Sequence, residues 1–143
     1  MTDLQKPHTL NVPMISQAGA MALLQAALDE AHAQGVAVCI SIIDPAGVPR
    51  AFMRMDGAPL AAVEMSRAKA QTALLGLGSA ELGEALAGQL PQLVSFAAQE
   101  RVALLGGGLP IVQDGAIVGA IGVGGASTEQ DVGIAEAAVR SLH

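Results

Sequence analysis

The middle of the chain concentrates basic side chains that could bind a small anion. Four of the seven bases lie between residues 50 and 69: Arg50, Arg54, Arg67 and Lys69. This stretch has only two acids, a balance of +2, although the whole chain carries −6. A positive region raises the local concentration of anions. Arg54 has a planar guanidinium whose parallel N–H donors suit a carboxylate, and Lys69 has a compact positive charge. The alternative is that these bases pair with nearby acids or lie in solvent.

The same stretch also carries groups for acid–base catalysis. If Arg54 clamped a small carboxylate metabolite, Asp56 or Lys69 could act as general base or acid after burial shifted its pKa. An enzyme of this kind is one alternative to a binding protein, and a ligand-free assembly or accessory module is another. All three interpretations stay open at this point.

Two methionines, Met53 and Met55, alternate with Arg54 along a predicted strand. Methionines most often fill gaps in a core. Beside a cation they could instead form the apolar wall of a pocket for a flat ligand with acidic substituents. A thioether can also ligate haem iron.

A glycine-rich turn precedes the last predicted helix. Gly122, Gly124 and Gly125 leave backbone N–H groups free near a helix N-terminus, which favours an anion. The turn is not a dinucleotide-binding motif, because it follows an antiparallel hairpin and no acidic residue stands about 20 positions further on. A plain tight turn is the alternative.

Histidine and cysteine do not form a metal-binding pattern. His8, His32 and His143 are scattered without ligand spacing, so the sequence predicts no metal site. His32 lies near the end of a predicted helix and is expected to be a surface residue that interacts with the helix dipole. Cys39 lies in the middle of a predicted strand and is expected to be a small core residue.

Composition limits the classes of protein. With 143 residues the chain has about the size of one domain, and 52% apolar against 14% charged residues excludes intrinsic disorder. No apolar stretch approaches 18 to 20 residues, so no membrane span is predicted. The negative charge and the lack of Trp and Tyr argue against nucleic acid. The apolar surplus favours a homo-oligomer. A single cysteine and the lack of a signal peptide favour the cytoplasm.

Apolar periodicity and turn residues predict the element order. The predicted elements are a helix over 16–35, a hairpin over 36–55 with its turn at 44–47, helices over 59–76 and 79–88, an ambiguous segment over 90–100, a hairpin over 109–123 and a final helix after a capping box at 127–130. In the helix over 59–76, the apolar side is predicted to hold Val63, Met65, Ala68, Thr72 and Leu75. The order favours an antiparallel sheet with helices on its faces. We expect a lead-in over 1–15 and one domain over 16–143.

Six short blocks resemble one family in order along the chain. They are Ile42–Gly47 (IIDPAG), Phe52–Ala58 (FMRMDGA), Ala68–Ala73 (AKAQTA), Gly106–Ile111 (GGGLPI), Asp114–Val123 (DGAIVGAIGV) and Glu129–Asp131 (EQD). Together they resemble the GlcG/HbpS family, also called the haem-degrading or DUF336 family, and the C-terminal domain of PduO-type proteins.

The resemblance implies a profilin-like, three-layer α/β/α fold with a five-stranded antiparallel sheet, and oligomeric assembly. It implies binding of haem or a related anionic tetrapyrrole. For such a ligand we expect a pocket between the strand that ends near residue 55 and the following helix, with Arg54 and Lys69 meeting the propionates and Met53 or Met55 lining the apolar wall. No histidine falls in a motif block, so no axial ligand is carried over. The family-like positions in this chain are Arg54, Asp56, Lys69, Gly107, Pro110, Gly122 and Asp131. The ligand-contacting glycines are expected to be Gly107, Gly124 and Gly125.

Overall fold

The computed structural model describes residues 8–143, so His8 is the first residue of the lead-in that can be placed. The elements are α1 (Gln17–Gln34), β1 (Cys39–Ile43), β2 (Pro49–Arg54), α2 (Ala61–Ala73), α3 (Ser79–Leu86), α4 (Leu90–Ala97), β3 (Gly108–Gln113), β4 (Ala116–Gly124) and α5 (Thr128–Arg140). The predicted order and the mixed α/β class are confirmed, and the ambiguous segment forms α4. Within residues 8–143, no helix is both long and apolar enough to cross a membrane.

The sheet has the strand order β2-β1-β4-β3, and all neighbouring strands are antiparallel. The expectation of five strands is wrong for the described part of the chain, which forms four. Residues 102–107 run up to β3 without forming a strand, because side chains of the helices take up their backbone groups. Ala103 N donates to Thr72 Oγ1 at 2.9 Å, and Leu105 O accepts from Ser79 Oγ.

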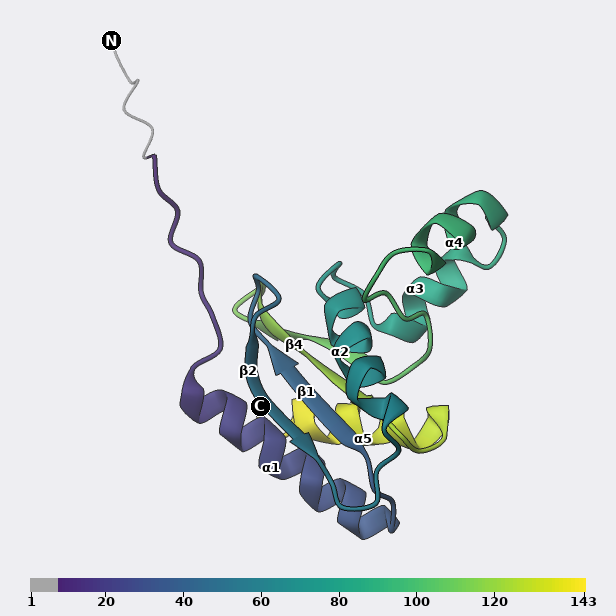
Figure 1. Cartoon of the computed structure of the whole chain (residues 1–143). Coiled ribbons are helices and arrows are strands. Elements are labelled where there is room, and N and C mark those ends of the chain that lie inside the picture. The colour runs from purple at the N-terminus through teal and green to yellow at the C-terminus, as the bar shows by residue number, and fades with distance from the viewer. Residues whose placement is uncertain (1–7) are drawn as a thin grey trace.

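Helices cover both faces of the sheet, which gives three layers. Figure 1 shows α1 and α5 on one face and α2 on the other, with α3 and α4 extending away from the sheet. The main core lies between the sheet and the pair α1 and α5. Its fully buried large side chains are Leu23, Val38, Ile40, Ile42, Ile121, Val123 and Ile134. The profilin-like label itself stays a prediction.

The hairpin turns follow the local chemistry of their residues. Asp114 and Gly115 both adopt positive φ, at 51° and 78°, as a two-residue type I′ turn requires. In the other hairpin, Asp44 Oδ1 accepts hydrogen bonds from the backbone N–H of Ala46 and Val48 at 2.8 and 3.0 Å. Both predicted hairpins are therefore confirmed.

Apart from Lys69, the side of α2 that meets the sheet consists of small residues, contrary to prediction. Met65 and Leu75, expected on the buried side, are exposed by 38% and 58%. The buried positions are Ala62, Ser66, Lys69, Ala70, Thr72 and Ala73. The helix lies so close to the sheet that a Cβ on Gly122 would lie 1.9 Å from Ser66 O. Large apolar residues would not fit into this interface.

Candidate functional site

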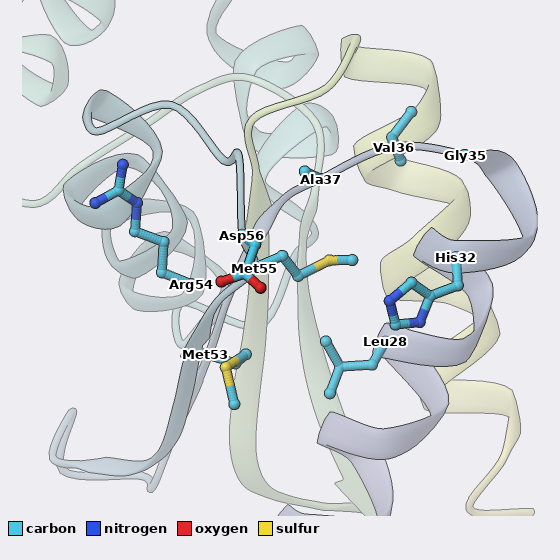
Figure 2. A pocket seen from close by; sticks show the side chains of 9 residues that line it. All are labelled: Leu28, His32, Gly35, Val36, Ala37, Met53, Arg54, Met55 and Asp56. Atoms are coloured by element: carbon cyan, nitrogen blue, oxygen red, sulfur yellow. The ribbon is translucent and has the colours of Figure 1, made fainter.

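An open recess of about 450 Å³ lies between the C-terminal end of α1 and strand β2 (Figure 2). Its lining residues are Leu28, His32, Gly35, Val36, Ala37, Met53, Arg54, Met55 and Asp56. Four of them, Met53 to Asp56, belong to the stretch that the sequence singled out. The recess combines aliphatic side chains, thioethers and one imidazole.

Strand geometry divides the predicted residues of β2 between the two faces of the sheet. Successive side chains on a strand point to opposite faces. Met55 packs against the core on the α1 side, whereas Arg54 pairs with Cys39, which is buried on the α2 side. Figure 2 shows Met55 directed toward α1 and the guanidinium of Arg54 directed away from both methionines. The cation and the thioether wall that the sequence placed together thus face different ways. The recess itself lies beside α1, whereas the sequence predicted it between β2 and the following helix.

The two methionines differ in burial and in hydrogen bonding. Met55 is half-buried, and its Sδ accepts a hydrogen bond from Val38 N at 3.4 Å, which fixes the thioether beside the start of β1. Met53 is 40% exposed at the rim. One thioether is therefore held by the fold, while the other is free to meet a ligand.

His32 is the recess residue that sequence analysis missed. It lies in the last turn of α1, which ends because Gly35 adopts a left-handed conformation with φ of 68°. The helix end was predicted, but the adjacency of β2 to it was not. His32 is exposed, and Figure 2 shows its imidazole on the recess side of α1, facing the methionines. The segment 35–38 joins α1 to β1, and the predicted hairpin pairs the start of β1 with the end of β2, so these two features together could have indicated that the end of β2 lies near the end of α1.

The Arg54 guanidinium holds the turn that follows β2. Its Nε and Nη2 donate to Ala58 O at 3.1 and 2.9 Å. A guanidinium has five N–H donors in all, so donors remain for a further acceptor. Arg54 is exposed, and Asp56 lies close to it in the same turn. The backbone contact explains why the end of β2 has a fixed shape.

Lys69 lies away from the recess, in the interface between α2, β4 and α5. Its Nζ donates to Asp131 Oδ2 and to Val123 O, both at 2.9 Å, and both side chains of the ion pair are 3% exposed. Burial raises the pKa of the Asp131 carboxyl, although Lys69 and the backbone N–H of Ala126 act in the opposite direction. The structure therefore does not bring Lys69 together with Arg54 or with Asp56.

The glycines predicted to contact a ligand lie outside the recess as well. Gly107 has φ of 123°, and a Cβ there would lie 2.5 Å from Val123 O. Gly124 and Gly125 pack against α2 and its preceding loop. The N-terminus of α5 is satisfied by the chain itself, since Ser127 Oγ accepts from Gln130 N at 3.1 Å. These glycines permit close packing in this structure.

Within residues 8–143, no group of three or more His, Cys, Asp or Glu residues is placed to hold a metal ion. Cys39 is fully buried, as expected of a core residue. Burial raises the pKa of its thiol, although the charge of Arg54 has the opposite effect.

A four-stranded antiparallel sheet with helices on both faces and a recess beside its edge strand defines a small three-layer α/β domain. Residues 15–140 match the family described as "Haem degrading protein HbpS-like", and the chain belongs to this family. The predicted resemblance to GlcG/HbpS proteins is thereby confirmed.

Individual relatives agree with this assignment. The corrinoid adenosyltransferase PduO of Salmonella typhimurium is 34% identical over 128 residues, which cover 85% of this chain but 37% of PduO. The structure of Klebsiella pneumoniae protein ORFY is 31% identical, with a TM-score of 0.88 and 96% coverage of both chains. The structure described as "PduOC:Heme Complex" is 31% identical, with a TM-score of 0.83, and covers 90% of this chain and 94% of that one.

Proposed function

We propose that this protein is an oligomeric ligand-binding protein that takes haem, or a related anionic tetrapyrrole, into the recess between α1 and β2. The observation that carries the proposal is the placement of one imidazole and two thioethers, from His32, Met53 and Met55, around the same apolar recess. Membership of the HbpS-like family and the likeness to a protein described as a haem complex support it.

The recess meets the chemical needs of a haem. Leu28 and Val36 supply apolar surface for the macrocycle. The imidazole of His32 is a common iron ligand, and the Met53 thioether can supply a second one, because its sulfur is not fixed as that of Met55 is. The free N–H donors of Arg54, at the rim, suit a propionate. A bound haem would supply an iron centre for redox chemistry or small-ligand binding.

The openness of the recess supports an oligomer. Ligand sites typically have about 300–1,000 Å³ and enclose most of the ligand. A volume of about 450 Å³ fits, but the recess is open to solvent. Met53, at the rim of the recess, is 40% exposed, so a second copy packed there would cover apolar surface and shelter the ligand. We place the oligomer in the cytoplasm, in line with the single buried cysteine.

The acid–base enzyme has less support. It needs Asp56 and Lys69 near one substrate, whereas Lys69 is 3% exposed and its Nζ is paired with Asp131. No specific contact favours that alternative over binding.

Haem titration tests the proposal. Because the chain lacks Trp and Tyr, absorbance in the near ultraviolet and visible regions reports the bound chromophore. We expect a saturable Soret band with the wild-type protein, and a shifted or lost band in His32→Ala. His143→Ala, at the chain end, is the matched control and should bind as the wild type does. Absence of saturation at micromolar haem, or an unchanged band in His32→Ala, would contradict the proposal.

A further inference from the structure

A second, smaller pocket lies between β2 and α2, away from the proposed haem site. It has about 170 Å³. Its lining residues are Ser41, Ile42, Ile43, Pro49, Ala51, Phe52, Val63, Glu64 and Arg67. None of these residues lines the recess beside α1. The pocket is therefore a separate feature of the molecule.

A β-bulge lies at this pocket. The register of the β1–β2 pair shifts between Ile42 and Ile43, so that Ile43 pairs with Pro49 while Ile42 pairs with Ala51. A bulge leaves a residue without a partner and bends its strand. Four residues of this irregular region line the pocket, which explains why a cavity forms here while the rest of α2 packs tightly on the sheet.

Arg67 lines this pocket and carries a polar atom without a hydrogen-bond partner. Its Nε is buried and has no hydrogen-bond partner, and neither ion pair within residues 8–143 involves Arg67. Gln71, one turn further along α2, also has an unpartnered buried oxygen, so these two groups do not satisfy each other. A buried donor that lacks a partner is unfavourable, and such groups are rare in native proteins.

We propose that this pocket binds a short-chain carboxylate, with the carboxylate accepting hydrogen bonds from Arg67 and the alkyl body lying against Phe52 and Val63. Arginine forms strong, charge-assisted hydrogen bonds with carboxylates, often with two oxygens at once. The size of the pocket limits the ligand: a water molecule occupies about 30 Å³ of liquid, so 170 Å³ admits about six atoms of similar size. A four-carbon monocarboxylate has six non-hydrogen atoms.

Glu64 sets the strength of binding. It lies one helical turn before Arg67 and lines the same pocket, but it is not within ion-pair distance of the guanidinium. Its charge repels an incoming carboxylate without occupying the donor. Removing that charge should therefore strengthen binding, whereas removing the guanidinium should abolish it.

Butyrate and its neutral analogue butyramide are the probes, because they have the same size and differ in charge. Ligand-observed NMR with the full chain should give a Kd for butyrate of about 1 mM, a plausible strength for six atoms, and binding of butyramide weaker by at least about tenfold. In ¹⁵N spectra, the Arg67 Nε–H signal, assigned by its loss in Arg67→Gln, should shift with butyrate. Equal binding of the two probes would overturn the proposal, whether or not any variant folds.

Variants separate the groups involved. Arg67→Gln should lose butyrate binding, Glu64→Gln should bind it more tightly, and Arg50→Gln, an exposed base outside the pocket, should bind it as the wild type does. Haem should not compete with butyrate, because the two sites share no lining residue. Retained butyrate binding in Arg67→Gln would show that the proposal is wrong. The proposal is also wrong if the wild type binds no butyrate and Arg67→Gln changes the oligomer size, because Arg67 then contacts another chain.

Discussion

Lys69 on α2 and Asp131 on α5 form a buried ion pair, with 2.9 Å between Nζ and Oδ2, in the interior beside β4. The same ammonium also bonds Val123 O, and the second carboxylate oxygen of Asp131 accepts from Ala126 N at 3.1 Å. Lys69 of α2 thus meets residues of β4 and α5 that lie 54 and 62 positions further along the chain, which makes this charged contact a structural junction.

Removing one partner of this pair should strongly destabilise the protein. Lys69→Met leaves the Asp131 carboxylate buried without its cation, and such losses cost about 3–5 kcal/mol. Urea unfolding measures the change in free energy of unfolding. Glu136→Gln, which removes the exposed pair with Arg140 at 3.8 Å, is the control and should cost less than about 1 kcal/mol. A loss of less than about 1 kcal/mol in Lys69→Met would show that the pair is not a structural junction.

The raised pKa of Asp131 gives stability a defined dependence on pH. Because burial disfavours the charged form, the folded state keeps this proton to a higher pH than the unfolded state, where the pKa is about 3.9. The contribution of this carboxyl to stability is present below its unfolded pKa and is lost as pH rises through the folded one. The stability advantage of the wild type over Asp131→Asn should therefore decrease as pH rises above about 4. Urea unfolding of both proteins across this range measures it, and an advantage that grows with pH would mean that Lys69 outweighs burial.

The close approach of α2 to the sheet predicts a sharp difference between two glycines of β4. A Cβ at Gly122 would lie 1.9 Å from Ser66 O, whereas a Cβ at Gly124 would come no closer than 3.4 Å to its neighbours. We expect Gly122→Ala to cost about 3 kcal/mol or more, the upper range for overpacking, and Gly124→Ala less than about 1 kcal/mol. Thermal and urea unfolding test this, and equal costs would contradict the described packing.

Cys39 should be unreactive in the folded protein. It is fully buried, and burial raises the pKa of its thiol, so little reactive thiolate forms. Ellman's reagent should detect no fast-reacting thiol in the native state and one thiol per chain in denaturant. Rapid reaction of the native protein would indicate that the sheet opens near β1.

Arg54 should contribute to haem affinity but not to iron ligation. Its guanidinium is directed away from Met53 and Met55, and it already donates hydrogen bonds to Ala58 O. Its contribution to haem affinity is therefore limited to a solvent-exposed contact with a propionate. We expect Arg54→Ala to weaken haem binding about fivefold, the effect of losing about 1 kcal/mol, with the Soret maximum unchanged. A shifted maximum would mean that Arg54 controls the position of the iron.

Local chemistry made much of the fold predictable. The Asp114-Gly115 turn, the Ser127 capping box and the Gly35 helix end each depend on a few adjacent residues, and each is found as predicted. The buried side of α2 was mispredicted, because glycines of β4, more than 45 residues away, make that interface favour small residues.

The residues that line the candidate recess were predicted only in part, for the same reason. The sequence singled out Met53, Arg54 and Met55, which do line the recess. It placed Lys69 with them because charges close in sequence were counted together, whereas the fold buries Lys69 against Asp131. His32 was missed because only the tertiary contact between α1 and β2 brings it to the methionines.

The two outer strands, β2 and β3, each contain a proline, Pro49 and Pro110. A proline has no N–H to offer, so an incoming strand would meet an interrupted row of donors at either border of the sheet. A continuous sheet that grows from chain to chain is therefore disfavoured, and we expect any contact between copies of this protein to use side-chain surfaces.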